Sequence, residues 1–282
     1  MRFFDFFAGI GGFRLGMEMA GHECVGHCEI DKYANLSYAA MHHPKKSEVF
    51  FTDVRTVDPW DMPECECYCF GFPCQAFSIS GKRRGFADTR GTLFFEVMRL
   101  AKERKPEILF AENVAGLLNH EGGITFGIII STMAELGYSV EWQVLNSKDF
   151  GVPQHRQRVF IIGHLGNGSG KQVFPICGTD GKVDLYINRI AHANNFRRMY
   201  QTFEIDGLCE CMDTMGGGGH QPCVSLNGKI RKLTPKECFR LQGFPDEYFE
   251  RAAEVCSDSQ LYKQAGNSVT VNVIYEIAKR LK

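Results

Sequence analysis

The chain has 282 residues, 44% of them hydrophobic, with 32 Lys and Arg against 33 Asp and Glu and a net charge of -1. This composition excludes disordered and fibrous proteins, and no run approaches the roughly 20 apolar residues that span a bilayer. Residues 3–10 are apolar but are interrupted by Asp5 and lack a following cleavage site, so we expect no secretory signal. The twelve cysteines are scattered, which favours a reduced, cytoplasmic compartment, and their spacing predicts no metal site.

In the first half of the chain, short apolar runs alternate with helical patterns, as in an α/β fold with a mostly parallel sheet. Strands are predicted at residues 2–7, 23–29, 49–54, 67–70, 108–112, 139–145 and 158–163. Helices are predicted at residues 13–20, 33–41, 93–104, 125–136 and 269–281. Residues 166–170 (GNGSG) are typical of a linker, and residues 171–227 show weak periodicity. We therefore expect a large discontinuous domain closed by the last helix, with a small irregular domain inserted late.

A glycine turn, residues 8–12, follows the first predicted strand and lets a ligand approach the backbone. Glu29, at the end of the second strand, stands where a ribose-binding carboxylate belongs. A dinucleotide site needs Gly or Ala where Arg14 stands, so a mononucleoside cofactor such as S-adenosylmethionine fits better. A purely structural turn is the alternative. Asp53 either accepts a bond from an adenine amino group or caps a helix.

Cys74 follows the fourth strand on a turn made rigid by proline, in the sequence GFPCQAFS. A thiolate presented in this way is a strong nucleophile, although a single cysteine is more often a small core residue. The basic stretch at residues 80–85 (SGKRRG) predicts a loop that closes over a phosphodiester, or else an ordinary surface loop. Glu112 follows the fifth strand and would lie beside the end of the fourth if the two are neighbours. Arg156 and Arg158, two apart on a strand, would face one side, that of the pocket.

These motifs resemble those of the C5-cytosine DNA methyltransferase family, the enzymes of bacterial and phage restriction–modification systems. The matching blocks stand in family order within residues 1–163 and 229–281, about three quarters of the chain. They are DFFAGIGGFRLG, EIDKYA, TDV, GFPCQAFS, RGTLFF, ENV, QHRQRVFIIG, RKLTPKECFRLQGFPD and QAGNSVTVNVIYEIAKRL.

The resemblance implies a Rossmann-like S-adenosylmethionine-binding domain, residues 1–168 and 258–282, and a small target-recognition domain, residues 169–257. It implies a DNA (cytosine-5-)-methyltransferase that flips a cytosine out of duplex DNA and methylates C5 through a covalent Cys-C6 adduct. Cys74 would be the nucleophile, Glu112 would hold N3 and the exocyclic amine, Arg158 would stabilise O2, and Arg156 would support the site or a phosphate. The implied cofactor-binding residues are Phe7, Gly9, Gly11, Gly12, Glu29, Ile30, Asp53, Val54, Pro73, Leu93, Asn267 and Ser268.

DNA contacts are expected from two stretches of the chain, the loop after the nucleophile and the glycine run of the inserted segment. In the loop, the Ser80 side chain would enter the space that the flipped cytosine leaves in the DNA helix. For the glycine run, the alternative to a base-contacting loop is a flexible tether. The implied DNA-contacting residues are Ser80, Lys82, Arg83, Arg84, Gly216, Gly217 and Gly218. The partner would be double-stranded DNA, with no membrane, for a monomer in the cytoplasm of a bacterial or phage-infected cell. A cognate restriction endonuclease would form no stable complex with it.

Three alternatives differ in class. A relative that methylates tRNA would have a Cys-Phe-Thr motif and a Pro-Pro-Cys block, which this chain lacks. A catalytically inactive DNA-binding regulator is disfavoured because Cys74, Glu112 and Arg158 are all present. A NAD-dependent oxidoreductase is disfavoured by Arg14 and by every later block. The net charge of -1 is compatible with DNA, because Lys82, Arg83, Arg84 and Arg90 stand in one short stretch opposed only by Asp88.

Overall fold

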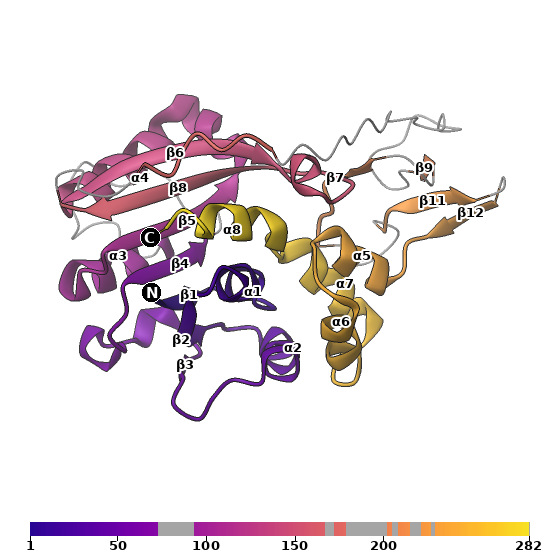
Figure 1. Ribbon diagram of the computed structural model, residues 1–282, viewed down its shortest axis with the longest axis horizontal. Coiled ribbons are helices and arrows are strands. Elements are labelled where there is room, and N and C mark those ends of the chain that lie inside the picture. The colour runs from indigo at the N-terminus through magenta and orange to yellow at the C-terminus, as the bar shows by residue number, and fades with distance from the viewer. Residues whose placement is uncertain are drawn as a thin grey trace.

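The computed structural model describes residues 1–72, 93–166, 172–178, 202–204, 208–214, 221–226 and 229–281. Its centre is a seven-stranded sheet in the order β3-β2-β1-β4-β5-β8-β6 (Figure 1). The first five strands in this order are parallel, and β8 runs antiparallel to both β5 and β6. The strands are β1 (Arg2–Phe6), β2 (Glu23–Cys28), β3 (Val49–Phe51), β4 (Cys67–Gly71), β5 (Ile108–Val114), β6 (Tyr138–Asn146) and β8 (Gln157–Leu165).

Helices cover both faces of this sheet because side chains alternate along its buried strands. In β1, Phe4 and Phe6 pack in one core with α3 (Leu93–Arg104) and α4 (Ile124–Glu135). Phe3 lies in a second core with α1 (Gly12–Met19) and α8 (Val271–Ala278). The α1 and α8 helices pack closely, since a Cβ at Gly16 would lie 2.6 Å from the Cβ of Ile274.

A third core joins the late helices to the start of the chain. It contains α5 (Pro235–Leu241), α6 (Asp246–Ala253) and α7 (Asp258–Asn267), together with Ile10 from the glycine turn and Met41 from α2 (Lys32–His42). Thr234 and Glu237 form a capping box at the start of α5, which fixes where that helix begins. The late helices therefore pack against the same turn that is expected to hold a cofactor.

Short strands lie beside these helices, on the right in Figure 1. A three-stranded sheet has the order β12-β11-β9, built from β9 (Thr202–Glu204), β11 (Cys223–Leu226) and β12 (Lys229–Lys232). A separate parallel pair joins β7 (Gln154–His155) to β10 (Cys209–Glu210). Short 3-10 helices are η1 (Val54–Thr56), η2 (Pro59–Asp61), η4 (Ala115–Gly123) and η5 (Ser147–Phe150). No described helix is long and apolar enough to cross a bilayer.

The expected α/β class and mostly parallel sheet are confirmed, and most predicted elements match the observed ones within two residues. The predicted strand at residues 49–54 is wrong in its second half, since β3 ends at Phe51 and Val54 begins η1. The cause is the Asp53 side chain, which accepts the Arg55 N–H and so ends the extended chain as a helix cap. The division into two domains stays a prediction.

Candidate active site

The glycine turn after β1 has an unusual backbone. Phe7, Gly9 and Gly11 have φ values of 54°, 55° and 79°, in the left-handed region that favours glycine. Non-glycine residues in this region cluster at functional sites, and Phe7 is one of them. Nothing lies within 4 Å of a Cβ built on Gly9, whereas a Cβ on Gly11 would lie 2.2 Å from Nε2 of His42. Gly9 thus leaves space for a ligand, and Gly11 leaves space for a histidine of the protein itself.

Glu29 follows β2 and reaches back to this turn. Its Oε2 accepts a bond from the Gly9 N–H and its Oε1 accepts one from the Asp31 N–H, both at 2.8 Å. Each carboxylate oxygen can accept further bonds, so Glu29 can still receive two ribose hydroxyl groups. Asn35 donates to the Glu29 carbonyl at 2.8 Å and fixes the backbone as well. The predicted ribose-binding carboxylate is therefore held by the turn it was expected to serve.

Asp53 has an ion-pair partner that the sequence did not reveal. Arg55 Nη2 lies 2.6 Å from Asp53 Oδ2, and Arg55 Nε donates to both carboxylate oxygens. The hydrogen bond from Arg55 holds the pKa of Asp53 below its ordinary value. The helix-cap interpretation of Asp53 is correct, and its side chain also borders the cavity described next.

A cavity of about 960 Å³ lies at the carboxyl ends of β1, β4 and β5, where ligands bind in parallel sheets. This is within the range of small-molecule sites. Most of the predicted cofactor residues line it, but Gly11 is not among the lining residues. Those that line it are Phe7, Gly9, Gly12, Glu29, Ile30, Asp53, Val54, Leu93, Asn267 and Ser268.

Glu112 and Arg158 form an ion pair at one end of this cavity. Glu112 lies beside Gly71 in the β4–β5 register, so the expected neighbourhood of these strands is confirmed. Because β8 is antiparallel to β5, its first residues reach the same edge, and Arg158 Nε lies 3.0 Å from Glu112 Oε1. Burial raises the pKa of Glu112 above its ordinary value, while the guanidinium groups of Arg158 and Arg156 oppose that rise. The site thus pairs a buried acid with a fixed cation.

Arg156 lines the cavity but directs its donors to the backbone. Its Nη2 donates to the carbonyls of Gly266 and Ser268 at 3.1 and 2.8 Å, and its Nη1 donates to the Met212 carbonyl at 3.0 Å. The residue is only 3% exposed. Burial lowers its pKa to about 10, so it remains a cation at neutral pH. Arg156 and Arg158 do line one pocket, as their spacing predicts, and both contact the Cys211 sulfur, but only Arg158 pairs with Glu112.

Asn113 holds the chain that leads to the predicted nucleophile. Its Nδ2 donates to the Phe72 carbonyl at 2.7 Å, two residues before Cys74. Several predicted site residues lie outside the described residues, so their expected roles stay predictions. They are Pro73, Cys74, Ser80, Lys82, Arg83, Arg84, Gly216, Gly217 and Gly218.

A second ion pair at the cavity, besides Asp53–Arg55, has no signal in the sequence. Lys263 Nζ of α7 lies 2.6 Å from Oδ2 of Asp31, and both residues line the cavity. Asp31 also caps α2 by accepting from the N–H groups of Tyr33 and Ala34. The position of Asp31 before a helical pattern is a cap signal, but its pairing with a residue 232 positions away has no local signal.

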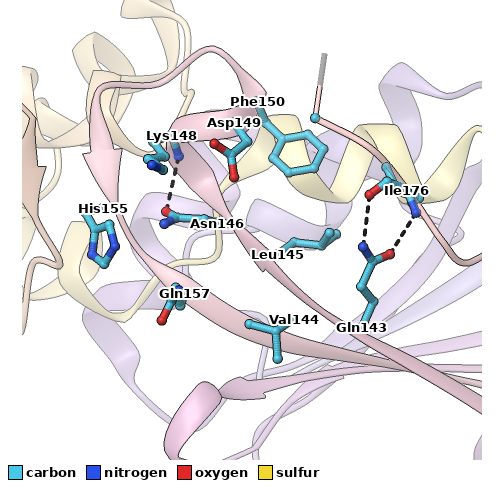
Figure 2. A pocket seen from close by; sticks show the side chains of 11 residues that line it. Gln143, Val144, Leu145, Asn146, Lys148, Asp149, Phe150, His155, Gln157 and Ile176 are labelled. Carbon is cyan, nitrogen blue, oxygen red and sulfur yellow. Dashed lines mark hydrogen bonds between the residues drawn. The ribbon is translucent and has the colours of Figure 1, made fainter. Parts of the chain in front are cut away.

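A second cavity, of about 310 Å³, lies between β6, η5 and residues 176–178 (Figure 2). Its lining includes His155 and Gln157, which alternate along the chain with Arg156 and Arg158 of the larger cavity. Gln143 spans it by bonding both backbone groups of Ile176, as the dashed lines in Figure 2 show. Among the predicted site residues that the structure describes, none lines this cavity.

The chain also matches known proteins along nearly its whole length. A family model described as C-5 cytosine-specific DNA methylase matches residues 1–176 and 183–282. The chain is 38% identical to the type II methyltransferase M.HhaI of Haemophilus parahaemolyticus, over 99% of this chain and 93% of that protein. It is 36% identical to the type II methyltransferase M.Bsp6I of Bacillus sp. (strain RFL6), over 98% of this chain and 96% of that protein.

Among solved structures, the fold is similar to that of the Dnmt2 methyltransferase of S. pombe. The TM-score is 0.76 at 21% identity, covering 99% of this chain and 97% of that one. The methyltransferase EhMeth of Entamoeba histolytica gives a TM-score of 0.74 at 20% identity, covering 100% and 97%. These likenesses concern the fold, whereas the family match extends over nearly the whole sequence. The chain belongs to the C-5 cytosine-specific DNA methylase family.

Proposed function

We propose that this DNA (cytosine-5-)-methyltransferase flips a cytosine out of a specific duplex site and methylates it through a covalent adduct with Cys74. One observation supports this above all. The ion pair between buried Glu112 and half-buried Arg158 lies in the same cavity as Glu29, and Asn113 fixes the backbone two residues before Cys74. An acid, a cation and a cofactor-binding carboxylate therefore surround the place where a base and a methyl donor would meet.

The residues at the cavity fit S-adenosylmethionine. Gly9 offers an open backbone, Glu29 has acceptor capacity for ribose hydroxyls, and Asp53 has a carboxylate at the rim. Ile30 is 67% exposed at the cavity, where its side chain can pack on an adenine face. When bound, the cofactor supplies an electrophilic methyl group on a sulfonium sulfur.

The chemistry of the substrate sets what the protein must do. Cytosine C5 is a poor nucleophile, so the Cys74 thiolate first forms an S–C6 bond, which makes C5 enamine-like. Negative charge then develops toward N3 and O2 of the ring. Glu112, with its raised pKa, can hold a proton for N3, and Arg158 can stabilise O2 as a fixed cation. C5 would bond to the methyl carbon as the bond from that carbon to the sulfonium sulfur breaks, which leaves the neutral thioether S-adenosylhomocysteine. A base would then remove the C5 proton, and the electron pair of the C5–H bond would expel the Cys74 thiolate by β-elimination, which breaks the S–C6 bond.

The finer assignments are part of the same proposal. We place the target-recognition region at residues 169–257 and the catalytic part at residues 1–168 and 258–282. We infer that the enzyme acts as a monomer, in the cytoplasm of a bacterial or phage-infected cell, where its DNA is. Any cognate restriction endonuclease would act on the same sequence without a stable complex.

Methyl transfer from tritiated S-adenosylmethionine to duplex DNA, followed by bisulfite sequencing, tests the proposal. We expect label at C5 of cytosines in one short sequence, no label on RNA, and loss of label with Cys74→Ala. The matched control is Cys177→Ala, because Cys177 is an exposed thiol that does not line the cavity. Transfer by Cys74→Ala at the wild-type rate, or label on RNA alone, would contradict the proposal.

A further inference from the structure

Arg156 joins two segments that are far apart in the sequence. Its Nη1 bonds Met212, in the segment of residues 208–214, and its Nη2 bonds Gly266 and Ser268, at the end of α7. The Cys211 thiol also lies 3.3 Å from Nη1. The planar guanidinium has donors in a fixed fork, so one side chain can hold two backbones at a set distance.

The two segments are also in direct backbone contact. A Cβ built on Gly266 would lie 1.8 Å from the carbonyl oxygen of Asp213 and 3.0 Å from Cα of Thr214. Any side chain at position 266 would therefore push the 208–214 segment away. Glycine at this position is explained by the close approach, since Gly266 lies inside a helix, where glycine is otherwise unfavourable.

Each segment belongs to a different part of the proposed function. Gly266, Asn267 and Ser268 line the cavity that contains Glu29. The 208–214 segment pairs with β7 through the Cys209 N–H, which donates to the Pro153 carbonyl at 2.8 Å. In the sequence it leads directly into residues 215–220, the glycine run expected to contact DNA. Arg156 thus connects the cofactor wall to the base of the expected recognition loop.

The arginine itself is held by a rigid frame. Its backbone N–H donates to Oδ1 of Asn146 at 3.0 Å, and its carbonyl accepts from the Ser147 N–H at 3.0 Å. Asn146 also caps η5 by accepting from the Lys148 N–H, as Figure 2 shows. The Ser147 hydroxyl lies 2.8 Å from that of Thr270, beside the cofactor wall. Arg156 is therefore held at its backbone as well as at its guanidinium group.

We propose that Arg156 is a positioning residue that couples occupation of the cofactor cavity to DNA binding through the 208–214 segment. Arg158, paired with Glu112, would contact the flipped base, whereas Arg156 acts through the backbones it holds. This inference rests on the proposed function. By linkage, a cofactor that strengthens DNA binding must itself be bound more tightly by the same factor when DNA is present.

The test measures the dissociation constant of a fluorescent duplex containing the methylated sequence, with and without saturating S-adenosylhomocysteine. The ratio of the two constants is the coupling. We expect a ratio of about tenfold for wild type, within the usual range of allosteric coupling, and a ratio within about twofold of one for Arg156→Lys and Gly266→Ala. Gly127→Ala is the matched control, because nothing lies within 4 Å of a Cβ there, and it should keep the wild-type ratio.

The ratio separates coupling from mere structural support. A residue that only stabilises the fold would weaken both affinities and leave their ratio unchanged. Thermal melting would reveal whether Gly266→Ala unfolds. In that case the coupling ratio of Arg156→Lys alone tests the inference, because lysine keeps the positive charge but lacks the forked N–H donors of the guanidinium group. A wild-type ratio of one, or an unchanged ratio in Arg156→Lys, overturns the inference. Failure of the proposed function is a separate result, since it appears as absence of methyl transfer by wild type.

Discussion

Replacement of Gly11 by alanine tests how the cofactor turn is built. Gly11 has a φ of 79°, and left-handed backbone costs a residue with a Cβ roughly 1–2 kcal/mol. The new Cβ would also lie 2.2 Å from Nε2 of His42, which donates to the Ile10 carbonyl at 2.9 Å. Displacing His42 forfeits that bond, worth about 0.5–1.5 kcal/mol. Together these effects predict a loss of about 1.5–3.5 kcal/mol in the free energy of unfolding.

The chain offers a control that isolates the backbone effect. Gly21 has a φ of 86°, and nothing lies within 4 Å of a Cβ built there. Urea unfolding of Gly21→Ala should therefore show the loss of about 1–2 kcal/mol alone. Calorimetry should show weaker S-adenosylhomocysteine binding for Gly11→Ala, by at least about tenfold, and unchanged binding for Gly21→Ala. Equal losses of stability with equal cofactor affinity in the two variants would refute the proposed role of His42 beneath the turn.

Three further predictions concern buried polar groups. Glu48→Ala removes one of two carboxylates that pair with buried Arg14, since Nη1 lies 2.7 Å from Glu48 Oε2 and Nε lies 3.0 Å from Glu18 Oε1. The loss of hydrogen bonds to a charged group should cost about 1.5–3 kcal/mol of unfolding free energy in a urea titration. Lys45→Ala, at an exposed pair with Glu23, should cause no measurable loss in the same titration. Burial raises the pKa of Glu112 above its ordinary 4.5, so ionisation of this carboxyl disfavours the folded state. The stability of wild type relative to Glu112→Gln should therefore fall as the pH rises from 4.5 through the raised pKa. A difference in urea midpoints that stays flat or rises over this pH range would contradict the prediction. Asn113→Ala removes the bond to the Phe72 carbonyl and should lower the methyl-transfer rate about tenfold, the equivalent of about 1.4 kcal/mol, with S-adenosylhomocysteine affinity unchanged by calorimetry.

Local patterns predict those parts of the site that depend on one strand and the turn after it. The glycine turn, Glu29 and Glu112 lie at the carboxyl ends of β1, β2 and β5, and the carboxyl ends of parallel strands in one sheet meet at the same edge. The motif blocks add Arg158, but its partner depends on β8 running antiparallel to β5, which brings its first residues to that edge. The alternation of buried residues is the same for either direction, so the sequence does not reveal it.

The remaining features depend on long-range contacts. Lys263 pairs with Asp31, and Arg156 bonds carbonyls more than 50 residues away. Side-chain charge suggests a partner for each of these residues but does not say which one. The α5 helix is different, because Thr234 and Glu237 form a capping box in the sequence TPKE, a local signal sufficient to predict where that helix starts.

The central claim is that Cys74 forms a covalent bond to C6 of a flipped cytosine. The most direct measurement incubates the protein and S-adenosylmethionine with duplex DNA that has 5-fluorocytosine at the target position, and then detects the complex by denaturing electrophoresis and peptide mass spectrometry. Because fluorine at C5 cannot leave as a proton does, β-elimination is blocked. We predict a stable adduct on the peptide containing Cys74, absent in Cys74→Ala and present in Cys177→Ala. Methylation of ordinary DNA at that site without any adduct on the fluorinated duplex would contradict the mechanism.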